Sequence, residues 1–217
     1  MRISKWCVGV LGLLVGGAAA AASLADFQDA VNRKGCESIP YDDLRSTCKS
    51  KSSEVADWCK GGRGKWSCDE LDPSGLTKQI ENVKRKIEDL KREKDELSRK
   101  KSDAKDDSER RELEDSLAAK ERDIYELEKK VEEWERRLSD EKRAANDRIY
   151  IGEQCHDARQ NVARVFESAK GRARSETDSE IKPYADRLAS SYEAEERGHA
   201  EAIDFVRRGI EKCKSMR

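Results

Sequence analysis

Apolar side chains recur every three or four residues along two central stretches, and charged side chains fill nearly all the positions between them. The first stretch places them at Leu76, Ile80, Val83, Ile87, Leu90 and Leu97. The second places them at Leu113, Leu117, Ile124, Leu127, Val131, Trp134, Leu138 and Ala145. Alternating spacings of three and four form the heptad repeat of a coiled coil, whose helices bury one narrow stripe against another helix. The pattern predicts a coiled-coil region over residues 73–151.

The two stretches are out of phase, and residues 98–110 between them contain no large apolar side chain. Two architectures explain this pattern. In one, the chain reverses near residues 102–108 and the helices pack antiparallel as a hairpin. In the other, one long helix continues through the phase change and pairs with another subunit. The absence of Gly and Pro from this segment disfavours reversal, but a hairpin buries both stripes within one chain, so we favour the hairpin.

Two further apolar stripes, separated by a polar segment, occupy the C-terminal region. The first contains Val162, Phe166, Ala169 and Ala173, and the second Leu188, Tyr192, His199, Ala202, Val206 and Cys213. Residues 174–182 between them are polar, and Pro183 is suited to the first turn of a returning helix. The sequence thus predicts a second, shorter hairpin. Folding about residue 184 sets Cys155 opposite Cys213 and predicts a disulfide there.

The segment 26–72 is rich in cysteine and is also expected to be helical. A first helix covers residues 26–34, a second opens at Pro40, and a third is capped by Ser52 or Ser53. So short a segment needs covalent support. The expected fold is all-α in four parts: a leader at 1–25, a disulfide-stapled Cys-rich module at 26–72, the coiled-coil region at 73–151 and a helical hairpin at 152–217.

The N-terminal leader resembles a secretory signal peptide in its order of residue types. Arg2 and Lys5 precede a short apolar run, and small residues follow it. Cleavage after Ala25 or after Ala22 fits this pattern, and an uncleaved anchor is the alternative. We therefore expect a secreted or periplasmic protein without a membrane span after cleavage, because no later segment is apolar enough.

Six cysteines follow the leader: Cys36, Cys48, Cys59, Cys68, Cys155 and Cys213. An even number in an exported chain predicts three disulfides, and no pair has the short spacing that zinc sites favour. Four cysteines in the first module allow three pairings. We prefer a nested scheme, Cys36–Cys68 outside Cys48–Cys59, over a sequential one.

The composition is that of an extended helical protein. Charged residues make up 42% of the chain and hydrophobic residues 35%, which excludes one large core. The leader holds two of the 45 Lys and Arg residues and none of the 46 Asp and Glu residues, so its removal changes the net charge from −1 to about −3. A chain so balanced has no general attraction for nucleic acid.

Two clusters carry possible chemistry. The loop 60–66 is basic and Gly-rich, and Arg63, Lys65 and Trp66 are candidates to bind an anionic or glycan ligand of the cell envelope. We favour the simpler interpretation, a plain loop between cysteines with Trp58 and Trp66 in the core of the module. The second cluster consists of two Glu-x-x-His pairs, the spacing used in di-metal helical bundles, formed by Glu153 with His156 and Glu196 with His199.

No catalytic motif supports an enzyme, and no cofactor motif is present. The sequence favours a structural or protein-interaction role, with a protein partner or a second copy engaged through the coiled-coil helices. A small binding module and a di-metal bundle are the alternatives.

Overall fold

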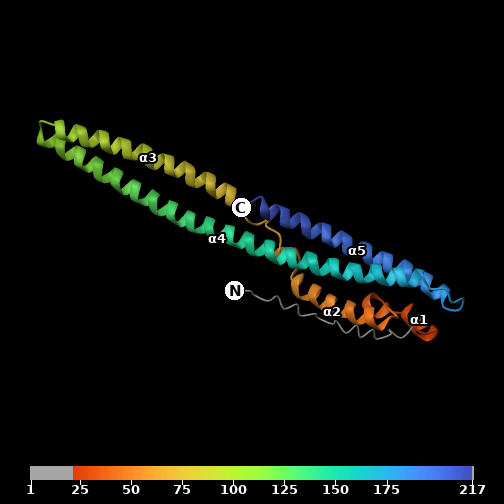
Figure 1. Cartoon of the computed structure of the whole chain (residues 1–217). Coiled ribbons are helices and arrows are strands. Elements are labelled where there is room, and N and C mark those ends of the chain that lie inside the picture. The colour runs from red at the N-terminus through yellow and green to blue at the C-terminus, as the bar shows by residue number, and fades with distance from the viewer. Residues whose placement is uncertain (1–21, 217) are drawn as a thin grey trace, which may run out of the picture. The chain divides into compact units, whose positions relative to one another are not determined.

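The computed structural model describes residues 22–216, and every regular element in that range is helical (Figure 1). The elements are α1 (Leu24–Ala30), η1 (Gly35–Ser38), α2 (Asp42–Trp58), η2 (Gly62–Lys65), α3 (Pro73–Asp103), α4 (Asp107–Arg174) and α5 (Lys182–Lys214), where η denotes a 3-10 helix. The all-α prediction is confirmed. The leader prediction falls mainly on residues 1–21, which lie outside the described residues.

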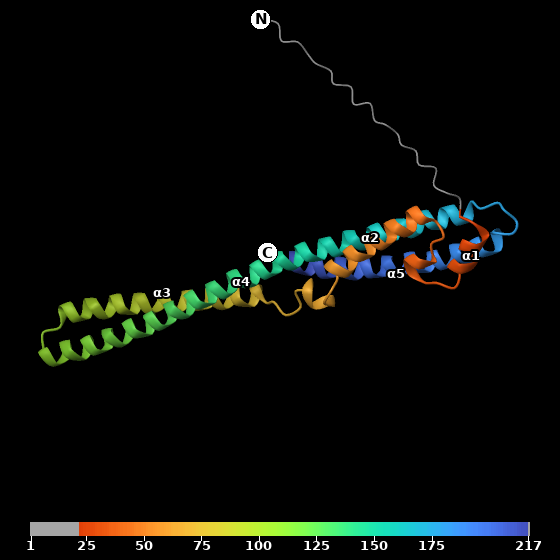
Figure 2. The same cartoon turned by 90° about the horizontal axis from the view of Figure 1, so that it is seen from below.

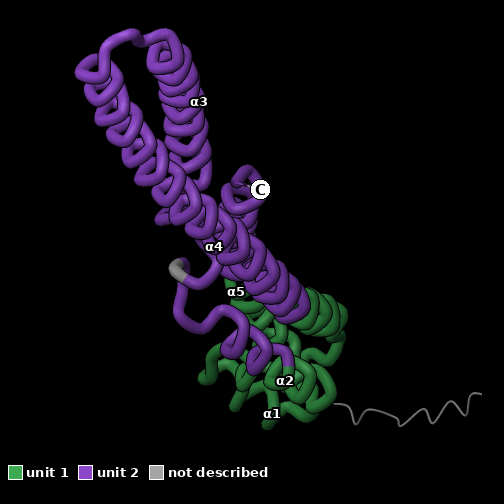
Figure 3. The backbone as a smooth tube through the Cα atoms, turned by 90° about the vertical axis from the view of Figure 1, so that its left-hand side faces the viewer, with its two compact units in different colours: residues 1–50, 164–196 green, residues 51–163, 197–217 purple. Residues whose placement is uncertain are grey.

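The chain divides into two compact units, coloured separately in Figure 3. Unit 1 contains residues 1–50 and 164–196, and unit 2 contains residues 51–163 and 197–217. Both units combine segments that are distant in sequence, because α2, α4 and α5 each contribute residues to both.

In unit 2, α3 and the first half of α4 form an antiparallel helical hairpin (Figures 1 and 2). The hairpin prediction is confirmed over the single long helix. Polar groups close the reversal without Gly or Pro: the Ser108 amide donates to Asp106 Oδ1 at 3.1 Å, and Arg110 Nη2 donates to the Ala104 carbonyl at 3.2 Å. We call this hairpin, residues 73–140, the arm.

Helix α3 begins at Pro73, where the predicted coiled-coil region begins, but two other helices differ from the prediction. The α3 N-cap is Asp72, whose carboxylate accepts from the Gly75 amide at 2.9 Å. The predicted break at Ser52–Ser53 is wrong, because α2 runs through these residues, where Lys51 and Glu54 pair at 2.6 Å. Helix α4 likewise continues through Gly152, where the sequence suggested the end of the coiled-coil region.

Beside the arm, side chains from three segments of the chain pack together in a hydrophobic core of unit 2. Its buried residues are Trp66, Cys68, Ala145, Ile149, Cys155, Val206, Ile210 and Cys213. Trp58, Cys59, Leu71 and Met216 pack against them. We call this cluster the stapled core, because α4, α5 and the segment 58–71 meet there and two disulfides cross it.

Unit 1 packs the N-terminal elements against the end of α4 and the start of α5. Phe27 of α1 is fully buried and meets the Tyr41 ring edge-on at 5.8 Å between ring centroids. Tyr192 of α5 is also fully buried, and its hydroxyl donates to the Ser38 carbonyl. Helix α1 begins at a capping box, in which the Ser23 hydroxyl accepts from the Asp26 amide and the Asp26 carboxylate accepts from the Ser23 amide.

The predicted turn between α4 and α5 is confirmed, because α4 ends at Arg174 and α5 begins at Lys182. In unit 2 the two helices run antiparallel, with Lys214 Nζ 3.6 Å from Glu153. This pair lies close to the register predicted from folding about residue 184.

The preferred cysteine pairing is wrong, although all six cysteines form disulfides. The bonds are Cys36–Cys48, Cys59–Cys155 and Cys68–Cys213. The predicted Cys155–Cys213 bond does not form, because both side chains of the hairpin instead face the segment 58–71 that covers it. The Cys-rich segment is therefore no separate module, because two of its cysteines bond to α4 and α5.

Candidate functional site

The arm buries its own apolar stripe. The buried residues are Ile80, Ile87, Leu90, Ile124 and Val131, with Val83, Leu127, Trp134 and Leu138 packed against them. All nine belong to the predicted heptad positions. Because each helix covers the stripe of the other, the arm needs no partner to hide these side chains.

Ion pairs between α3 and α4 flank the stripe along the arm. They join Lys84 to Glu135, Lys91 to Glu128, Glu93 to Lys120, Lys94 to Glu121 and Lys101 to Glu114 at 2.5–3.1 Å. Residue numbers rise along α3 as they fall along α4, which fixes the antiparallel register. Each pair is solvent-exposed and adds little free energy by itself. Together they favour this register over a slipped one.

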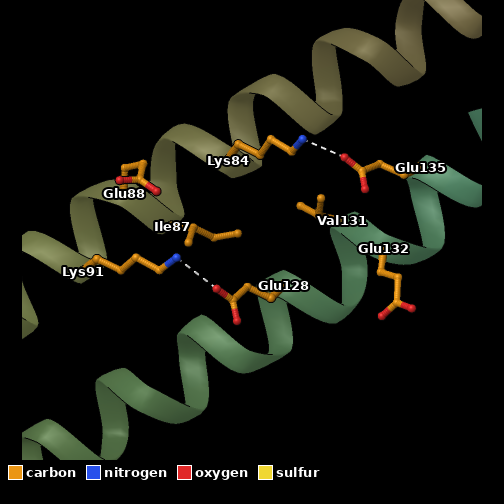
Figure 4. Close-up of a pocket in the computed structure, with 8 residues that line it drawn as sticks. All are labelled: Lys84, Ile87, Glu88, Lys91, Glu128, Val131, Glu132 and Glu135. Atoms are coloured by element: carbon orange, nitrogen blue, oxygen red, sulfur yellow. Dashed lines mark hydrogen bonds and ion pairs between the residues drawn. The ribbon is translucent and has the colours of Figure 1, made fainter.

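An open groove runs along one side of the arm (Figure 4). Ile87 and Val131 point toward each other at its floor, and the Lys84–Glu135 and Lys91–Glu128 pairs bridge it. Both floor residues are less than one-tenth exposed. The groove still offers a partner apolar surface together with the charged groups of Lys84, Lys91, Glu128 and Glu135.

Exposed aromatic side chains occur on both parts of unit 2. Tyr125 on the arm is 58% exposed, with Lys129 Nζ 4.7 Å above its ring. Tyr150, beside the stapled core, is 55% exposed and meets Trp58 edge-on at 5.9 Å.

The loop 60–66 places its three candidate residues in different environments, and Trp66 lies in the core, as the plain-loop interpretation expects. Two successive glycines with positive φ, Gly61 at 92° and Gly62 at 64°, turn the chain back after α2. Trp66 is then 4% exposed and packs edge-on against Phe205 at 5.3 Å, so its indole is part of the stapled core. Lys65 is exposed, and Arg63 forms an ion pair with Asp69 at 2.7 Å.

Arg63 instead helps to line a shallow hollow that the sequence analysis did not identify. The hollow is lined by Arg63, Trp66, Ser67, Asp69, Phe205, Arg208, Gly209 and Lys212. Phe205, Arg208 and Lys212 lie at spacings of three and four on α5, and this spacing of an aromatic with two cations was the available signal. We call this site the basic hollow.

The basic hollow holds one carboxylate among three cations. Asp69 accepts hydrogen bonds from Lys212 Nζ at 2.6 Å and from Ser67 Oγ at 2.7 Å, and it pairs with Arg63. These contacts, led by the one from Lys212, lower the pKa of Asp69 from 3.8 to about 2. These contacts thus favour the charged form of Asp69, although the site is open to solvent.

The four residues of the two Glu-x-x-His pairs are not brought into one cluster. Glu153 pairs with Lys214 and Glu196 with Lys170, while His156 Nδ1 lies 3.0 Å from Asp157. Among the described residues, no group of three or more His, Cys, Asp or Glu side chains is arranged to hold a metal ion.

The other large pKa shifts belong to two tyrosines of unit 1, the half-buried Tyr41 and the fully buried Tyr192. Burial raises the pKa of Tyr41 to about 12 and that of Tyr192 further. Tyr192 lies in the hydrogen-bonded core, so these shifts report packing.

Comparison with family models, with curated proteins and with solved structures returns no match. Within residues 22–216, no helix has both the length and the apolar character needed to cross a membrane. The three disulfides indicate an oxidising environment.

Proposed function

We propose that the protein is exported and acts as a structural or protein-interaction module, which presents the charged arm to a protein partner. The supporting observation is the contrast within unit 2 between an arm that satisfies its own apolar stripe and a core held by two disulfides. A surface that needs no partner for folding remains available for recognition.

Recognition by the arm would rest on charge. Its outer positions are almost entirely Lys, Arg, Glu and Asp, and Glu88 and Glu132 beside the groove make none of the ion pairs described above (Figure 4). Charged surfaces of this kind set partner choice and association rate more than total affinity. Binding to the arm should therefore weaken as salt concentration rises.

Export would remove an N-terminal leader that ends at Ala22 or Ala25, and the α1 capping box favours one of these two cleavage positions. Cleavage after Ala22 keeps Ser23 as the N-cap, whereas cleavage after Ala25 removes it together with the first two residues of α1. Loss of such a cap typically costs about 1 kcal/mol. We therefore propose Ser23 as the first residue of the exported chain.

The mass of the protein recovered from outside the cytoplasm tests export and the cleavage position together. A chain that begins at Ser23 is expected. A chain that begins at Asp26 would contradict the cleavage position alone, and an intact leader on protein retained in the cytoplasm would contradict export.

Photo-crosslinking tests the role of the arm. A benzophenone amino acid at Tyr125 on the arm should give a single crosslinked protein in the native host, and the same amino acid at Tyr150 should not. The two tyrosines are matched in exposure, so the comparison separates the arm from the rest of unit 2. The same crosslinked product from both positions would contradict presentation by the arm, as would no product from either.

A further inference from the structure

The basic hollow gathers cationic side chains from two chain segments, the loop after α2 and α5, around one carboxylate. Three cationic side chains and one carboxylate line it, and Asp69 is already shared between Arg63 and Lys212. The hollow is therefore a concave site with positive charge in excess.

Arg208 is the cation of the basic hollow that is not paired with Asp69. Its guanidinium makes no ion pair or hydrogen bond among the interactions of the described residues, and its one contact there is with the Phe205 ring, 6.0 Å from the centroid. The guanidinium of Arg63 also lies over this ring, at 5.4 Å. Stacking on a ring leaves the N–H edge of a guanidinium open for a bidentate contact with a carboxylate.

Phe205 adds an apolar surface between these cations. It is 41% exposed, one of three large apolar side chains that the described residues leave in solvent to this degree. Its edge-on contact with Trp66 places the ring against the stapled core. A ligand that fits must therefore offer negative charge beside an apolar group.

We propose that the basic hollow binds an acidic segment of a protein partner, in which carboxylates flank an apolar side chain that packs on Phe205. The carboxylate of Asp69, seated between Lys212, Ser67 and Arg63, shows that this set of donors fits carboxylate oxygens. Arg208, with assistance from Lys212, would receive the carboxylate of the partner. This site is separate from the arm and does not depend on the function proposed for it.

Peptide binding to the purified full-length protein, with its disulfides intact, tests the proposal. The probes are acetylated and amidated Glu-Glu-Leu-Glu-Glu, Glu-Glu-Gly-Glu-Glu and Lys-Lys-Leu-Lys-Lys, with sodium sulfate as a bare anion. The variants are Arg208→Glu, Phe205→Ala and Arg207→Glu. Arg207 is the matched control, because it is an exposed neighbour that pairs with Asp204 and does not line the hollow. Helical content and the three disulfides are checked in each variant.

The leucine-containing acidic peptide should bind best. Arg208→Glu should weaken it by about tenfold or more, the scale of one charge-assisted hydrogen bond. Arg207→Glu should change it by less than about twofold, the scale of a screened surface charge. Phe205→Ala should remove the preference for leucine over glycine.

Four results would overturn the proposal. They are absence of binding by either acidic peptide, equal binding by the Lys peptide, equal weakening by Arg207→Glu and Arg208→Glu, and binding of sulfate that matches the peptides and is insensitive to Phe205→Ala. The last result would identify a plain anion site. Because Arg208→Glu alters an exposed side chain, a folding defect in Phe205→Ala would leave the test intact.

Discussion

The arm and the stapled core of unit 2 are built from the same long helix but are stabilised in different ways. Along the arm, α4 meets only α3, and a single stripe of side chains is buried with exposed ion pairs on either side. In the stapled core, α4 meets α5 and the segment 58–71, and two disulfides join these segments. The buried residues of the arm stripe keep 5–8% of their surface exposed, whereas Cys68, Cys155 and Cys213 of the stapled core are fully buried. The comparison explains why covalent bonds and large aromatic side chains gather at one end of the unit.

The largest predicted loss of stability comes from removing a disulfide of the stapled core. Replacing Cys68 and Cys213 by serine removes a bond between residues 145 apart, which contributes about 5 kcal/mol by chain entropy. Replacing Cys36 and Cys48, only 12 residues apart, should cost about 3 kcal/mol by the same reasoning. Denaturant unfolding monitored by circular dichroism measures both. A smaller loss for the Cys68–Cys213 pair than for the Cys36–Cys48 pair would show that this bond does not hold the segments together.

The next largest predicted loss of stability comes from truncating a buried side chain of the arm. Ile87 is 5% exposed at the centre of the buried stripe, so Ile87→Ala should cost about 2–4 kcal/mol. The exposed Tyr125 provides the control, because Tyr125→Ala should cost less than about 0.5 kcal/mol. Hydrogen exchange should show the loss of protection in residues 73–140 and not in the stapled core. Equal loss in both regions would contradict their separate stabilisation.

A pair of glycines on α5 sharpens the comparison. A Cβ at Gly209 would lie 2.6 Å from the Trp66 ring, so Gly209→Ala should destabilise the stapled core by about 1–3 kcal/mol. At Gly198 nothing lies within 4 Å of the added Cβ, and Gly198→Ala should stabilise the helix by about 0.5–1 kcal/mol. We therefore expect Gly209→Ala to lower the melting temperature and Gly198→Ala to raise it. A stabilising Gly209→Ala would show that Trp66 does not pack on α5.

The smallest effect concerns Asp69 at the rim of the stapled core. Its pKa falls from 3.8 in an ordinary environment to about 2 in the fold. The contribution of Asp69 to the free energy of unfolding is therefore complete above pH 4 and is lost as the pH falls through 2. The difference in stability between the wild type and Asp69→Asn should therefore shrink as the pH is lowered from 4 to 2. Glu135→Gln on the arm is the control, because it removes an exposed ion pair there. A difference for Asp69→Asn that stays constant over this range would contradict the contacts with Lys212 and Arg63.

Much of the fold is readable from the sequence because helical periodicity is a local signal. The stripe from Leu76 to Leu138 predicted both helices of the arm and the hairpin, and the polar segment before Pro183 predicted the second reversal. The turn at Ala104 was less evident, because Asp106 and Arg110 close it with side-chain hydrogen bonds that leave no Gly or Pro signal.

The disulfide pairing and the basic hollow were not readable, because both depend on segments distant in sequence. Cys155 and Cys213 are nearly level on α4 and α5, but their sulfurs bond to the segment 58–71, whose position no local pattern encodes. The same packing buries Trp66 and brings Arg63 to Phe205. A single sequence indicates helices and their apolar faces, but it does not indicate which third segment covers a face.

Non-reducing peptide mapping of the exported protein tests the central claim most directly, because the disulfides define the stapled core that holds the arm. The account predicts crosslinked peptides that join Cys59 to Cys155 and Cys68 to Cys213, with Cys36 joined to Cys48. A peptide that joins Cys155 to Cys213 would contradict it, since the two helices would then be closed on each other without the segment 58–71.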